Sequence, residues 1–304
     1  MKVIEQFKNS PESSLSIFLL HGVIKNKFKK KNSVLNYNKK HLEVRKFKFF
    51  LNEILKYGKP LSMDEVHELI LYKKKILKKS FAITFDDGFE NNISIAAPIL
   101  LKKNIPFTLY ITTNFIDKNM MSWIDFIDYA VEKTKAKSIN EFNTTFKLTD
   151  FSDKIFFLNT VRSIIKNDKK INPHNFVKKI CNKLDVKKFP SNLEIYKKMD
   201  WNQLKKLSKN KLCIIGGHSH THKILGYLKN KDLDYEIKKT LFLIKKNLNI
   251  NAYHYSYPEG FKKSFSKNVI KTLKKFKIKC CPTAIPGINT HKSNPFLLKR
   301  INVV

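Results

Sequence analysis

Thr84-Phe85-Asp86-Asp87-Gly88 is the segment that decides how this chain of 304 residues is interpreted. The apolar run Phe81-Ala82-Ile83 leads into it, which predicts a buried strand that ends at two carboxylates and a glycine. Adjacent aspartates contribute little to packing, because carboxylates are rarely buried without a partner. We therefore expect them to belong to a chemical site at the end of this strand.

A histidine cluster provides the complementary half of that site. His218-Ser219-His220-Thr221-His222 follows Gly216-Gly217, and its outer histidines are four residues apart. This spacing places two rings on one side of a helical turn, and an extended backbone would align them as well. Two imidazoles and one carboxylate suit Zn²⁺ or another divalent transition metal, with a coordination position left open for water. The alternatives are a polar turn with solvated histidines and, for the aspartates, an Asx turn or a helix N-cap.

Three motifs occur in an order that resembles one known family. They are Thr84–Gly88, the element Gly216-Gly217-His218-Ser219-x-x-His222, and Tyr257-Pro258-x-Gly260. This order is similar to that of the polysaccharide deacetylases (NodB-homology family, carbohydrate esterase family 4), and is closest to the branch that contains poly-N-acetylglucosamine deacetylases. The resemblance runs from about Ser16 to Val304. It implies an α/β fold, a distorted (β/α)7-type barrel with a helical insertion, whose catalytic loops lie at the carboxyl ends of the strands.

We assign Asp87, His218 and His222 as the metal ligands. His220 lies between the two histidine ligands and should point elsewhere. Asp86 precedes the ligand aspartate and points to the other side of the chain. From there it can accept a proton from the same water as a general base.

The resemblance implies three further catalytic positions. A backbone N–H just after Pro258 helps to hold the oxyanion in this family; here it belongs to Glu259, where an aromatic residue is common. His21, at the end of an early strand, takes the place of the general acid in the closest branch, since the Leu-x-His motif of many members has no match near the C-terminus. Arg300, in a segment that resembles the terminal strand, would hold Asp86 ionised. An ordinary turn, a packing histidine and a surface arginine are the respective alternatives.

The order of predicted elements indicates a parallel sheet or barrel within a single domain, residues 1–304. An N-terminal strand and helices occupy 1–77, the core spans about 78–304, and a mostly helical, lysine-rich insertion spans about 117–190. Strands are expected at 16–20, 81–85, 107–112, 213–215, 253–257 and 278–284. Helices are expected at 43–57, from Ser62 with Glu65 as a capping box, and at 91–103, 200–209, 232–249 and 264–276.

The formal net charge of +35 invites a nucleic-acid interpretation, which the kind of basic residue weakens. Only Arg45, Arg162 and Arg300 are arginines, although arginine is the usual residue for bidentate phosphate recognition, and the lysines are spread along the chain. The expected partner is a carbohydrate that bears N-acetyl groups. A surface this basic also attracts an anionic membrane surface or a pyrophosphate-linked sugar.

The cysteines and the N-terminus favour a cytoplasmic location, extending to peripheral association with the inner membrane surface. The four cysteines form no C-x-x-C pair, and the first residues lack the layout of a signal peptide. The predicted function is metal-dependent hydrolysis of an N-acetyl group on an amino sugar, in a polysaccharide, a glycolipid or a nucleotide-linked precursor of a surface glycan. Two alternatives stay open: a related amidase or deformylase, and a non-catalytic glycan-binding protein on the same fold.

Overall fold

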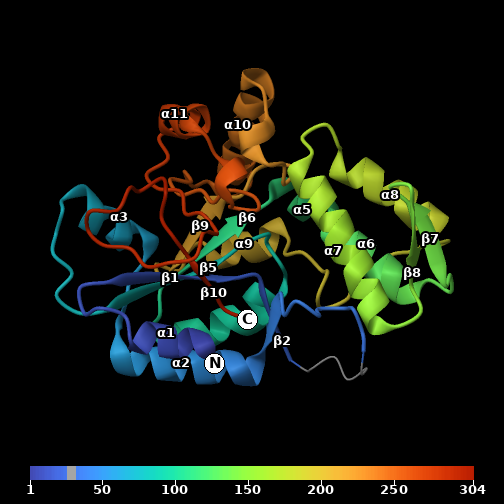
Figure 1. Cartoon of the computed structure of the whole chain (residues 1–304). Coiled ribbons are helices and arrows are strands. Elements are labelled where there is room, and N and C mark those ends of the chain that lie inside the picture. The colour runs from blue at the N-terminus through green and yellow to red at the C-terminus, as the bar shows by residue number, and fades with distance from the viewer. Residues whose placement is uncertain (26–31) are drawn as a thin grey trace.

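A parallel β-sheet forms the centre of the protein, as seen in a computed structural model that describes residues 1–25 and 32–304 (Figure 1). β1 (Leu15–Leu20) pairs with β5 (Ser80–Phe85) and with β10 (Ile301–Asn302). β5 pairs with β6 (Phe107–Ile111), and β6 pairs with β9 (Cys213–Gly217). The short β4 (Lys59–Pro60) joins the first residues of β5. Every residue of β1, β5 and β6 is buried, as expected for parallel strands covered on both faces.

Irregular segments close this sheet into a distorted barrel. Single parallel bridges link Gly217 to Tyr255, His254 to Cys280 and Pro282 to Leu298, and the chain then enters β10, which returns to β1. The predicted (β/α) barrel is confirmed. The strands predicted at 253–257 and 278–284 are reduced to these bridges, because prolines at 258 and 282 carry no N–H for a continuous ladder.

Helices cover both faces of the sheet, with α1 (Lys2–Lys8) and α2 (Val44–Tyr57) on one side and α10 (Asn230–Leu248) and α11 (Lys267–Lys275) on the other (Figure 1). The rings of Phe18 and Phe50 meet edge to face at 4.9 Å and join β1 to α2. The predicted capping box, Ser62 with Glu65, begins α3 (Met63–Leu71). The remaining elements around the barrel are a π-helical turn (Asn92–Ala96), α4 (Ala97–Lys102), α9 (Trp201–Leu207) and the 3₁₀ turns Leu225–Tyr227 and Lys262–Ser264.

A cluster of further helices lies to one side of the barrel (Figure 1). It contains α5 (Thr113–Lys118), α6 (Trp123–Lys133), α7 (Phe151–Asn167) and α8 (Pro173–Lys183), and most of it has a hydrophobic core of its own. Arg162 of α7 donates to both oxygens of Asp128 of α6, at 2.5 and 2.6 Å. The antiparallel hairpin β7 (Ser138–Glu141) and β8 (Thr144–Lys147) was not predicted, because each four-residue strand buries only one side chain, Ile139 or Phe146, and shows no clear period.

A small parallel pair, β2 (Gly22–Ile24) and β3 (His41–Glu43), flanks the barrel. Its register sets Gly22 opposite His41, so that His21 and Lys40, the preceding residues, lie at the same end. A Cβ on Gly22 would come within 2.1 Å of Nδ1 of His41, which explains the glycine. Across the described ranges 1–25 and 32–304, no helix has the length and apolar character needed to cross a bilayer.

Candidate active site

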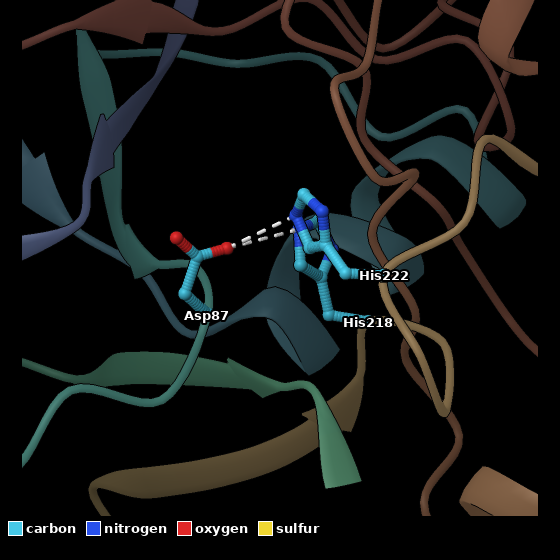
Figure 2. Close-up of side chains that lie close together, drawn as sticks. All are labelled: Asp87, His218 and His222. Carbon is cyan, nitrogen blue, oxygen red and sulfur yellow. Dashed lines mark ion pairs between the residues drawn. The ribbon is translucent and has the colours of Figure 1, made fainter. Parts of the chain in front are cut away.

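Asp87, His218 and His222 form a compact group of possible metal ligands (Figure 2). Oδ1 of Asp87 lies 3.2 Å from Nε2 of His222 and 3.6 Å from Nε2 of His218. Ligand atoms at tetrahedral Zn²⁺ bond lengths are about 3.3 Å apart, which these separations match. Nδ1 of His218 lies 2.9 Å from the carbonyl oxygen of Ser256, and an N–H donated there leaves the Nε2 lone pair free for a metal. The three residues therefore fit a divalent transition metal.

The histidine loop has a conformation that the sequence did not predict. The backbone at 218–222 is neither the helical turn nor the extended alternative, because Ser219 (φ 61°) and His222 (φ 58°) are left-handed and the segment is a loop after β9. Such backbone costs about 1–3 kcal/mol per residue and persists only where the surroundings hold it. Glu236 of α10 stabilises this loop conformation, because its carboxylate accepts hydrogen bonds from the backbone N–H groups of His220 and Thr221, each at 2.8 Å.

Asp86 lies beside the proposed ligands and is held by Arg300. Nη1 and Nη2 of Arg300 donate to the two carboxylate oxygens at 2.9 and 2.7 Å, and Nη2 also donates to Oγ of Ser256 at 3.0 Å. Burial raises the pKa of Asp86, but the positive charge of Arg300 outweighs it and holds this pKa below its usual range. Asp86 is therefore ionised at neutral pH, and its Oδ2 is 3.9 Å from Nε2 of His218.

His21 and Glu259 line the same cavity of about 280 Å³ as the two aspartates, His218 and His222. Burial lowers the pKa of His21 to about 4, so its ring is neutral at pH 7. Glu259 is left-handed at φ 62°, and its carboxylate forms an ion pair of 2.6 Å with Lys166 of α7. The structure thus brings all seven predicted site residues to one place, with Arg300 behind Asp86. Their individual roles stay predictions.

Two lysines of this site were missed from the sequence. Nζ of Lys40 lies 3.0 Å from Oδ2 of Asp87, and Lys166 reaches Glu259 from the helical cluster. Neither lysine stands out by spacing or residue type among so many others, and both partners are distant in the chain. The adjacent Lys40-His41 pair gave no signal, because the pairing of β2 with β3 was not predicted.

A second cavity of about 470 Å³ continues from this site between the barrel and the helical cluster. It shares His222, Lys166 and Glu259 with the first cavity. Its wall combines the apolar residues Trp123, Ile165, Ile171, Ile224 and Leu228 with the lysines 169, 170 and 223. A ligand bound at the metal ligands can therefore extend into a partly apolar, basic space.

Comparison with known proteins identifies the family. The model of the polysaccharide deacetylase family matches residues 73–281, and the chain belongs to this family. Among curated proteins, no sequence match was found. The predicted family is confirmed, and the chain is an enzyme of the N-deacetylase type.

Solved structures of deacetylases share the fold across nearly the whole chain. The Streptococcus pyogenes deacetylase PplD, in complex with acetate, is 14% identical, with a TM-score of 0.61 over 97% of this chain and 94% of that chain. IcaB from Ammonifex degensii is 14% identical, with a TM-score of 0.60 over 96% and 92%. The BpsB deacetylase domain from Bordetella bronchiseptica is 13% identical, with a TM-score of 0.56 over 97% and 98%. At these identities the likeness shows the fold.

Proposed function

We propose that the protein is a metal-dependent hydrolase that removes the N-acetyl group from an amino sugar. The observation that carries this proposal is the single cavity in which Asp87, His218 and His222 face one another beside the arginine-bound Asp86. A set of metal ligands next to an ionised carboxylate can supply both a polarised carbonyl and a base for the attacking water, which suits hydrolysis of an amide. Membership of the deacetylase family supports the choice of an N-acetyl substrate.

Each residue would contribute a separate part of the reaction. A divalent metal held by the three ligands supplies polarisation of the acetamide carbonyl and activation of the attacking water. Asp86 takes the proton of that water, because Arg300 keeps its carboxylate ionised. The N–H of Glu259 donates to the developing oxyanion. The C–N bond breaks as the leaving nitrogen gains a proton from His21, and acetate and a free amine are the products.

His21 is neutral before the reaction, so the proton that it gives must first reach it within the cavity. Burial is the main cause of its lowered pKa. The proton taken from water by Asp86 is the available source, since both side chains line the same cavity. His21 would then act as a proton carrier between water and amine.

The second cavity favours a substrate larger than a single sugar. Its apolar wall and its lysines 169, 170 and 223 suit a group that combines apolar and anionic character. We therefore favour a lipid- or nucleotide-linked N-acetyl sugar, whose pyrophosphate these lysines would meet, over a neutral polymer. Action at the cytoplasmic membrane surface, where such precursors are assembled, is part of this proposal.

Acetate release tests the reaction directly. Metal-stripped and Zn²⁺-restored protein would be incubated with N-acetylglucosamine oligomers, UDP-linked N-acetyl sugars and polyprenyl-diphosphate-linked N-acetyl sugars. We expect acetate only from the restored enzyme, none from His222→Ala, and at least a hundredfold less from Asp86→Asn with the metal still bound. Formate release from N-formyl sugars instead would indicate a related deformylase. Full activity of Asp86→Asn would remove Asp86 as the base.

A further inference from the structure

Lys40 occupies one oxygen of the proposed metal ligand Asp87. The dashed lines in Figure 2 join both imidazoles to the same carboxylate oxygen, Oδ1. The other oxygen, Oδ2, lies 3.0 Å from Nζ of Lys40, whose side chain is only 13% exposed. The carboxylate is thus divided between an oxygen that faces the two imidazoles and an oxygen that faces an ammonium group.

The fold fixes Lys40 in this place. It directly precedes β3, whose pairing with β2 aligns it with His21, and both residues line the catalytic cavity. Asn36 locks the turn, because its side-chain oxygen accepts the N–H of His41 at 2.8 Å and its amide donates to the carbonyl of His41 at 2.9 Å. Lys40 also reaches Oδ1 of Asp125 in α6, at 3.4 Å. The Lys40 side chain is thus held between Asp87 and Asp125.

The charge of Lys40 affects what the site offers to a metal. The ammonium group of Lys40 forms ion pairs with both Asp87 and Asp125. Asp86 is already paired with Arg300, and Asp87 is paired with Lys40. A metal ion bound here would therefore meet one carboxylate oxygen and two imidazoles beside a positive charge, and these groups would neutralise little of the charge of the ion.

We propose that Lys40 is a positioning residue of the metal centre, which leaves Asp87 only one oxygen for the metal. Lys40 would thereby weaken metal binding. It would also leave the bound ion with more of its positive charge, so that the ion withdraws electrons more strongly from the substrate. This inference rests on the proposed function for its catalytic part alone. Loss of the lysine would free both carboxylate oxygens and the full negative charge of Asp87 for the metal. Metal affinity would then rise while turnover falls, whereas a purely structural role would lower both.

Lys198 provides a matched control. Its Nζ lies 3.6 Å from Oδ2 of Asp125, and its side chain is fully buried, whereas that of Lys40 is 13% exposed. Each lysine leaves Asp125 with the other as a partner, so neither single substitution strands that carboxylate. Both rest over the ring of Phe89, with Nζ at 4.6 and 3.3 Å from its centroid. The two differ in contact with the metal ligand.

The experiment measures Zn²⁺ affinity of the metal-stripped full chain by competition with a chromophoric chelator, beside acetate release. We expect Lys40→Met to bind Zn²⁺ at least tenfold more tightly than wild type and to have a kcat at least thirtyfold lower. The Zn²⁺ affinities of Lys40→Arg and Lys198→Met should both stay within threefold of the wild-type value. Lys40→Gln provides the same comparison should the methionine variant fail to fold. Unchanged or weaker Zn²⁺ binding by the uncharged variants would overturn the proposal. If no substrate releases acetate from the wild type, the proposed function fails, and the Zn²⁺ titration still decides the role of Lys40.

Discussion

Arg300 and Asp86 form a buried ion pair, since Arg300 is 1% exposed and Asp86 is 3% exposed. Removing one member of a buried pair strands the other charge, at a cost of about 3–5 kcal/mol. We expect Arg300→Met to lower the free energy of unfolding by about this amount, as measured by urea denaturation. The same change should raise the pKa of Asp86 and lower kcat at least a hundredfold, because the base loses the charge that keeps it ionised.

The double variant Arg300→Met/Asp86→Asn controls for simple loss of packing. It removes both charges, so we expect it to be more stable than Arg300→Met alone by about 1–3 kcal/mol, although it stays inactive. Strictly additive losses of unfolding free energy would show that the two side chains are not coupled.

Site residues whose chemistry is unusual for their place in the sequence were predictable. Residues whose role depends on a contact with a distant part of the chain were not. Asp86, Asp87, His218 and His222 stand at the ends of apolar runs, where charged or imidazole groups have little structural reason to be. Lys40 and Glu236 act through contacts made 47 residues and 15–16 residues away. No local pattern encodes such contacts, because they arise only when the barrel brings the loops together.

At the level of elements, long strands and helices followed their periodicity, and short or strained ones did not. The helix predicted at 43–57 is observed as Val44–Tyr57, with Gly58 just beyond its end as predicted. The strands predicted at 253–257 and 278–284 are single bridges, and the histidine loop contains two left-handed residues, Ser219 and His222. Propensity failed in the histidine loop because the backbone N–H groups of His220 and Thr221 donate to Glu236, and these hydrogen bonds fix the backbone more strongly than local preference does.

The turn after Pro258 offers a prediction for one such strained element. Glu259 is left-handed at φ 62° and is tied to α7 through Lys166. If its N–H is the oxyanion donor, Glu259→Gly should keep kcat within about tenfold, because glycine adopts this φ readily and retains the N–H. Lys166→Met should reduce kcat more, since it leaves the Glu259 carboxylate unpaired in the cavity wall. Steady-state acetate release compares them; a larger loss in Glu259→Gly than in Lys166→Met would assign the role to the side chain.

Across the whole molecule, an ion pair between α3 and the closing part of the barrel couples stability to pH. Nε2 of His254 lies 2.9 Å from Oδ1 of Asp64, and Lys279 reaches the same oxygen at 3.2 Å. Burial lowers the pKa of His254, but Cys280 and Asp64 outweigh it and raise this pKa to about 9. The hydrogen bond from His254 holds the pKa of Asp64 below its usual range.

The sign of the pH effect follows from these shifts. The folded pKa of His254 exceeds its unfolded value near 6.5, so its stabilisation is complete below about pH 6.5 and is lost as the pH rises through about 9. Asp64 contributes above its unfolded pKa near 3.9 and loses its contribution as the pH falls. Because the side chain of Asp64 is half exposed, we expect Asp64→Asn to lower the free energy of unfolding by only about 1 kcal/mol at pH 7.

The net charge of +35 adds a second pH effect to the free energy of unfolding. Deprotonation of lysines near pH 10 relieves the repulsion between positive charges and stabilises the fold. The difference between wild type and Asp64→Asn removes this shared effect. We expect that difference in urea-unfolding free energy to be largest between pH 5 and 7 and to shrink as the pH rises to 10. Lys279→Met, which removes a charge from the same carboxylate but leaves His254 in place, should show no such decline between pH 7 and 10. A difference between wild type and Asp64→Asn that stays constant over this range would mean that His254 does not carry the proton that ties α3 to the barrel.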